Sequence, residues 1–208
     1  MPERGVCNSS GLQPKNKWTK MAYKTPIDEK QLVADLQNPA TARKAFDLLI
    51  REYGEQVYWQ IRKMVVSHDD ANDLLQNCFI KAWKNINNFR GDARLSTWLY
   101  KIAINESINF LNKERQRLGL TAEEADDSFL LQNIESDPYF DGDSLQVQLQ
   151  EAIMQLPEKQ RLVFNMRYYD DMKYEDISEV LGTSVGALKA SYHHAVKKIT
   201  AAIKDSEI

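Results

Sequence analysis

The stretch YEDISEVLGTSVGALKASYHHAVKK, from Tyr174 to Lys198, decides how this chain is expected to fold. It predicts two short helices joined by a tight turn, because apolar residues recur at helical spacing on both sides of Gly182. A glycine there favours the end of the first helix, where the backbone commonly turns to positive φ. Thr183 and Ser184 can then cap the second helix with their hydroxyl groups.

The second of these helices has two unlike faces. Its buried face is predicted to carry Val185, Leu188, Tyr192, Ala195 and Ile199. Its other face carries small, basic and hydrogen-bonding residues, namely Ala187, Lys189, Ala190, His193, His194 and Lys197. A basic helix with such a face suits the major groove of DNA. A helical hairpin with a solvated polar face fits this stretch equally well.

The composition favours an all-α protein. The chain has 208 residues, enough for two small domains or one larger one, and only 8 glycines and 6 prolines. No apolar run is long enough for a signal peptide or a membrane span, so we expect a cytoplasmic protein without membrane insertion. Cys7 and Cys78 form no disulfide framework, and Cys78 is predicted to be a buried thiol, which fits a reducing cytosol.

Charge is distributed unevenly along the chain. The net charge is −3, but residues 1–117 hold 19 Lys+Arg and 13 Asp+Glu, which gives +6. Residues 118–150 hold 8 acids and no base, and residues 151–208 hold 8 bases and 9 acids. This pattern predicts a disordered N-terminal extension (1–25), a first helical domain (26–117), an acidic flexible linker (118–143) and a second helical domain (144–208).

The first domain contains a regular amphipathic helix around Leu74. Its apolar stripe is predicted to include Cys78, Phe79 and Trp83, and a possible break at Gly54 divides the helical region before it. The face opposite the stripe carries Asp73, Gln76, Asn77 and Ile80.

A loop from Asn87 to Arg94 leads into another helix, which we expect Ser96 or Thr97 to cap. One face of this helix carries Lys101, Asn105 and Asn109. Amides can read base edges, rings can stack on bases and cations can meet phosphates, so this face and the loop residues Phe89 and Arg90 could bind unstacked bases. A merely exposed polar face is the simpler interpretation of this stretch alone.

The sequence His68-Asp69-Asp70 could belong to a metal site, as in metal-dependent phosphohydrolases. The chain has only 3 histidines, and the other two lie far along it. A helix start, with Asp69 or Asp70 as the cap, explains the sequence better. We therefore predict no metal and no cofactor.

Two segments together carry a resemblance. NDLLQNCFIKAWKNINNFRGDARLSTWLYKIAINESINFLNK resembles region 2 of bacterial RNA polymerase sigma factors. LPEKQRLVFNMRYYDDMKYEDISEVLGTSVGALKASYHHAVKKI resembles their region 4, and the short spacing between the two resembles the extracytoplasmic-function group. The resemblance implies a sigma factor rather than an enzyme. Its partners would be the β′ and β subunits of core RNA polymerase, promoter DNA, and an anti-sigma factor, which in this family is often membrane-bound.

The resemblance also implies roles for the residues already described. Binding of core polymerase falls to Asp73, Gln76, Asn77 and Ile80. Melting and binding of the minus-ten element falls to Phe89, Arg90, Trp98, Lys101, Asn105 and Asn109. Recognition of the minus-thirty-five element falls to Thr183, Ser184, Ala187, Lys189, His193, His194 and Lys197. Many members have arginine at the positions of Lys189, Ser191 and His194, so the promoter sequence is not implied.

Two alternatives stay open at this point. A stand-alone DNA-binding regulator would use only the second domain, and it leaves the polar faces around Asp73 and Asn105 unexplained. A metal-dependent hydrolase centred on His68 and Asp69 lacks enough ligands.

Overall fold

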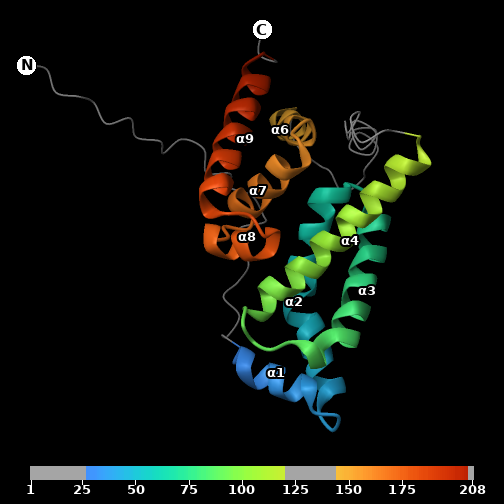
Figure 1. Ribbon diagram of the computed structural model, residues 1–208. Coiled ribbons are helices and arrows are strands. Elements are labelled where there is room, and N and C mark those ends of the chain that lie inside the picture. Colours follow the sequence, from blue (N-terminus) through green and yellow to red (C-terminus); the bar gives the residue numbers. More distant parts are fainter. Residues whose placement is uncertain (1–26, 120–143, 206–208) are drawn as a thin grey trace, which may run out of the picture.

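The computed structural model describes residues 27–119 and 144–205, and all the regular structure in these ranges is helical (Figure 1). The all-α prediction is therefore confirmed. The predicted disordered extension lies outside the described ranges, as does the predicted flexible linker apart from Leu118 and Gly119. We call residues 27–119 the N-terminal unit and residues 144–205 the C-terminal unit.

The N-terminal unit is a small bundle. It consists of α1 (Glu29–Gln37), α2 (Ala42–Val65), α3 (His68–Asn85), the 3-10 helix η1 (Ile86–Asn88) and α4 (Leu95–Arg117). Helices α2, α3 and α4 contact one another in pairs, and α1 lies across one end of the bundle (Figure 1). Leu49, Val57, Ile61, Leu99 and Leu111 are fully buried between them, so their spacing on the three helices explains the packing.

The C-terminal unit consists of α6 (Ser144–Met154), α7 (Glu158–Tyr168), α8 (Tyr174–Leu181) and α9 (Val185–Asp205). The turn between α8 and α9 is as predicted. Gly182 ends α8 with a φ of 62°, in the left-handed region that favours glycine. Ser184 caps the start of α9, since its hydroxyl oxygen accepts a hydrogen bond from the backbone N–H of Ala187 at 3.4 Å.

Three local predictions were wrong. Helix α2 runs through Gly54 without a break. The cap of α3 is Ser67, whose hydroxyl accepts from the N–H of Asp70 at 3.3 Å, while Asp69 and Asp70 lie within the first turn.

Helix α4 already begins at Leu95, so Ser96 and Thr97 lie inside it and do not cap it. The N–H of Leu95 donates instead to Oε2 of Glu29 at 3.3 Å. A carboxylate from α1 thus supplies the cap and suits the positive end of the α4 dipole.

The two units pack against each other. Helix α8 contacts α4, and α7 contacts α2, so that one apolar core runs from Leu99 in the first unit to Met166 and Ile177 in the second. Two ion pairs cross the boundary: Lys63 with Asp170, and Arg115 with Glu158. The division into two domains stays a prediction, and the two units share part of their core.

Candidate functional site

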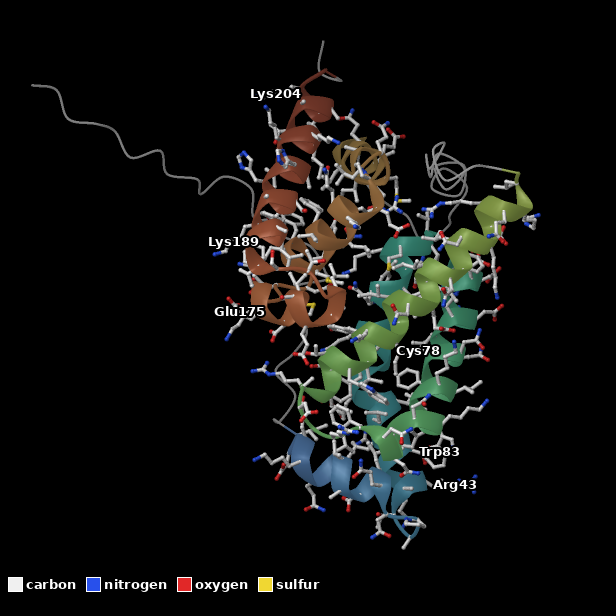
Figure 2. All side chains as sticks on the ribbon, in the orientation of Figure 1. Arg43, Cys78, Trp83, Glu175, Lys189 and Lys204 are labelled. Carbon is white, nitrogen blue, oxygen red and sulfur yellow. The ribbon has the colours of Figure 1, made fainter. Side chains whose placement is uncertain are left out.

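Helix α9 presents the basic face that the sequence predicted. Lys189, His193, His194 and Lys197 are exposed, as is Ala187, whereas Leu188, Ala195 and Ile199 on the other side are buried. Figure 2 shows Lys189 and Lys204 on the outer edge of this helix, directed away from the N-terminal unit. This face of α9 is therefore exposed to solvent.

The residues at the start of α9 hold backbone groups. The Thr183 hydroxyl donates to the carbonyl of Leu181 at 3.3 Å, and Ser184 provides the helix cap.

Tyr174, at the start of α8, lies beside Lys189, whose Nζ is 5.7 Å from the centre of the tyrosine ring. The Arg167 guanidinium lies 5.6 Å from the same ring centre. The ring of Tyr174 thus lies within cation–π distance of two basic side chains, a contact that the sequence analysis missed.

Helix α3 presents the second predicted face. Asp73, Gln76 and Asn77 are exposed, and Ile80 is 50% exposed, while Leu74 and Cys78 on the opposite side are buried. This face is therefore polar apart from one exposed apolar residue, Ile80.

Trp83 is not in the buried stripe, where it was predicted, but is 44% exposed. Its ring meets that of Phe46 edge to face, with the centroids 4.8 Å apart. The neighbouring residue Ala82 is buried, at 1% exposure.

Helix α4 presents the third face. Lys101, Asn105 and Asn109 are exposed and follow one another at intervals of four residues, so they lie on one side of the helix. The opposite side is buried through Ala103, Ser107 and other residues, and the Ser107 hydroxyl donates to the carbonyl of Ala103 at 2.9 Å. A row of one cation and two amides is thus held at fixed spacing.

The loop before α4 differs from the prediction. Phe89 is 9% exposed, and its ring lies 5.2 Å from that of half-buried Trp98, so it packs into the core rather than offering a face to a base. The side-chain amide of Gln37 holds this turn, since its Nε2 donates to the carbonyls of Ile86 and Phe89 at 3.0 and 2.9 Å. Arg90 is exposed. Periodicity could not show this, because a loop residue has no helical face that fixes its direction.

His68 is part of a hydrogen-bonded helix start. Its Nδ1 bonds with the Tyr58 hydroxyl at 2.7 Å, and its Nε2 bonds with the Asn72 amide at 3.0 Å. Within the described ranges, no group of three or more His, Cys, Asp or Glu side chains could hold a metal ion. Likewise, no helix in the part of the chain that the structure describes is long and apolar enough to cross a membrane.

The sequence analysis also missed a polar face on α2. Tyr53, Gln56, Gln60 and Lys63 follow one another at intervals of three, four and three residues, which places them on one side of the helix. The side-chain oxygen of Gln56 accepts from the Tyr100 hydroxyl at 3.4 Å, and Lys63 pairs with Asp170. The helical spacing of these residues was the available signal, but the sequence alone cannot distinguish a buried polar face from a solvated one.

Comparison with known proteins gives matches to two protein-family models. The family model "Sigma-70 region 2" matches residues 49–117, and the model "Sigma-70, region 4" matches residues 146–199. The RNA polymerase sigma-H factor of Pseudomonas aeruginosa is 33% identical over 187 residues, which cover 86% of this chain and 96% of that protein. The ECF RNA polymerase sigma factor SigW of Bacillus subtilis is 30% identical over 168 residues, covering 77% and 90%.

Two solved structures share the fold. The sigma factor RpoE of Bartonella quintana, in complex with the anti-sigma factor NepR, has a TM-score of 0.61 at 20% identity and covers 77% of this chain and 98% of its own. CnrH, in complex with the cytosolic domain of CnrY, has a TM-score of 0.62 at 20% identity and covers 85% and 97%.

The chain belongs to the sigma-70 family of RNA polymerase sigma factors, in its extracytoplasmic-function group. It binds RNA polymerase and directs the initiation of transcription at promoters. This is the function that the sequence resemblance implied.

Proposed function

We propose that three exposed helix faces divide the work of this sigma factor. The α3 face, with Asp73, Gln76, Asn77 and Ile80, binds the β′ subunit of core polymerase. The α4 face, with Lys101, Asn105 and Asn109, binds and opens the minus-ten element. The α9 face, with Lys189, His193, His194 and Lys197, reads the minus-thirty-five element in the major groove.

The observation that supports this division is the exposure of every one of these polar residues on helices whose other sides are buried. Polar side chains that are fixed to rigid helices can present a constant pattern of donors and acceptors to a partner. Arg90, in the loop before α4, is exposed and can meet a backbone phosphate. We do not include Phe89, because its ring is buried.

The protein acts by binding and not as an enzyme, and its place of action is the cytoplasm, with the polymerase and the DNA. An anti-sigma factor is a further proposed partner. The structures of RpoE with NepR and of CnrH with the cytosolic domain of CnrY support this proposal by their similarity to this chain.

A pair of variants tests the role proposed for α3. Asp73→Lys should weaken binding to core polymerase and leave the helical content unchanged, while Asp47→Lys, an equal charge change at an exposed position of α2, should have little effect. Core binding is measured by titration with labelled sigma factor. Equal affinity of the Asp73 variant and wild type would refute the role of α3.

Lys189→Ala should leave core binding intact and relax the preference of the holoenzyme at one or two upstream positions, with a cost of roughly 1–3 kcal/mol on the best site. Lys204→Ala, at the far end of α9, is the matched control. If Lys189 contacts only a phosphate, all sequences weaken alike and the slope of affinity against salt falls by about one. If neither the preference nor the slope changes, α9 is not the reading helix.

A further inference from the structure

Helix α1 holds the loop before α4 at both of its ends. At the entry, Nε2 of Gln37 donates to the carbonyls of Ile86 and Phe89 at 3.0 and 2.9 Å. At the exit, Oε2 of Glu29 accepts from the N–H of Leu95 at 3.3 Å. Helix α1 also contacts η1, and it lies across the end of the bundle where this loop runs (Figure 1). All three bonds go to backbone groups, so α1 fixes the path of the loop rather than any one side chain.

These bonds restrict two particular peptide groups. The carbonyl of Phe89 belongs to the peptide group that leads to Arg90. The N–H of Leu95 belongs to the peptide group that follows Arg94. A peptide group is planar, so a bond to one of its polar atoms restricts the direction in which the chain leaves it. Both arginines are exposed, and their directions are therefore set by α1.

Helix α1 is itself anchored in the bundle. Leu32 and Leu36 are each 2% exposed and belong to the core of the N-terminal unit. The Tyr53 hydroxyl, on α2, donates to Oε1 of Glu29 at 3.0 Å, so one carboxylate joins α2 to the start of α4. Burial, followed by the nearby Glu29 carboxylate, raises the pKa of Tyr53, so this hydroxyl stays protonated and keeps donating near neutral pH. The loop is thus tied to a fixed support.

A loop that is held in this way can select among ligands. Donors at fixed positions favour the one arrangement of acceptors that matches them, whereas donors on a free loop adapt to several arrangements. The same bonds also set the loop against the α4 face, because Leu95 is the first residue of α4. Arg90 therefore keeps one position relative to Lys101 and Asn105 on that face.

We propose that α1 positions the loop from Phe89 to Arg94, which we call the minus-ten loop, for selective binding of the minus-ten element. Gln37 and Glu29 are positioning residues, since they act through the backbone of this loop. The proposal rests on the function proposed for α4. It extends that function to a helix that precedes the matched region 2 segment, residues 49–117.

The first measurement needs no DNA. In the full chain, Gln37→Glu keeps the shape of the side chain but replaces its donor with an acceptor, so the two carbonyls lose their partner. Gln31→Glu makes the same exchange at an exposed position of α1, where the amide donates to Asp35 at 3.0 Å within the helix, and serves as the control. Trypsin should cut after Arg90 and Arg94 about fivefold faster in the Gln37 variant, the factor that corresponds to one ordinary hydrogen bond. Mass spectrometry identifies the cut sites.

Glu29→Ala tests the other end of the loop. It removes the acceptor of the Leu95 N–H and should also speed cleavage, whereas Glu29→Gln keeps one side-chain oxygen and should stay closer to wild type. Circular dichroism checks folding. If Glu29→Ala does not fold, Gln37→Glu decides the question, because Gln37 is exposed. Cleavage as slow as in the control would show that α1 does not hold the loop and would overturn the proposal.

The second measurement is the preference of the holoenzyme on a promoter library that is randomised at the minus-ten element. Sequencing the templates that form open complexes gives the enrichment of the best sequences over the average. In Gln37→Glu this enrichment should fall several-fold, while core affinity and the minus-thirty-five preference stay as in wild type. A purely structural defect would lower open-complex formation on all templates alike, and that result would count against a positioning role. An unchanged preference beside faster cleavage would also refute it.

Failure of the proposed function has a different signature. A wild-type holoenzyme without any minus-ten preference would refute the role of the α4 face, and the role of α1 in promoter selection would fall with it. The cleavage rates would still show whether α1 holds the loop.

Discussion

At the scale of single residues, Cys78 has surroundings that suppress thiol chemistry. It is fully buried between α3 and α4, and its Sγ donates to the carbonyl of Leu99 at 3.9 Å. Burial, with a smaller contribution from the nearby Glu106 carboxylate, raises the pKa of the thiol to about 12. Because the thiolate is the reactive form, almost none is present near neutral pH.

We therefore expect Cys78 to resist alkylation in the folded protein. In a Cys7→Ser background, iodoacetamide at mildly alkaline pH should react slowly with the native chain and rapidly after denaturation in urea, as followed by mass spectrometry. Equal rates in the two states would mean that the core around Cys78 opens easily.

A second prediction at the scale of single residues concerns Asn105 and the opening of promoter DNA. Asn105→Ala should cost on the order of 1–3 kcal/mol in promoter opening if its amide contacts a specific base. The loss should shrink on templates that are already mismatched at the minus-ten element, as measured by open-complex formation. Gln116→Ala, an exposed amide near the end of the same helix, serves as the control. An equal loss on both templates would argue against a role in opening.

At the scale of elements, two glycines near the turn between α8 and α9 should respond to substitution in opposite ways. Gly182 has a φ of 62°, which a residue with a Cβ adopts only with strain. Gly186 lies in the first turn of α9, and a Cβ added there would meet no atom within 4 Å.

Gly182→Ala should therefore lower the free energy of unfolding by about 1 kcal/mol, and Gly186→Ala should raise it by about 0.4–1 kcal/mol. Urea denaturation followed by circular dichroism measures both. If the two substitutions had the same sign, the backbone of this turn would differ from that described.

Helix boundaries could be predicted from sequence where a residue at the boundary itself sets them. Gly182 ends α8 as expected, and Asp28, a residue type favoured at helix starts, caps α1 by accepting from the N–H groups of Lys30 and Gln31 at 3.0 and 3.1 Å. The start of α4 could not be predicted, because its cap comes from Glu29, far away in the sequence. The three polar faces were recognised from spacing, whereas the burial of Phe89 depends on the path of a loop.

At the scale of the whole molecule, the packing of the two units is what sequence analysis could not supply. Gln60, Lys63, Asn165 and Asp170 are polar residues, which a pattern of hydrophobicity assigns to the surface. Their burial follows only from the apolar residues around them, such as Met166 and Ile177, which belong to a core that both units share. Amphipathic periodicity shows that a helix has a buried side but not which helix covers it.

The shared core predicts that the units stay together after the chain is cut. With a protease site inserted between residues 120 and 143, the two halves should still elute from a sizing column as one species at micromolar concentration. The apolar contact and the ion pairs of Lys63 and Arg115 hold them. Two separate peaks would show that the units associate only because they are tethered. The same insertion without cleavage is the control.

The buried amides of Gln60 and Asn165 also have an evolutionary consequence. They lie apart from the exposed faces of α3, α4 and α9, so a change at either position leaves the proposed promoter and polymerase contacts untouched. Selection could thus adjust how tightly the two units pack, by exchanging an amide for an aliphatic side chain, without altering which genes it serves. The cohesion of the molecule and its choice of targets would then be inherited as separate traits of a single small protein.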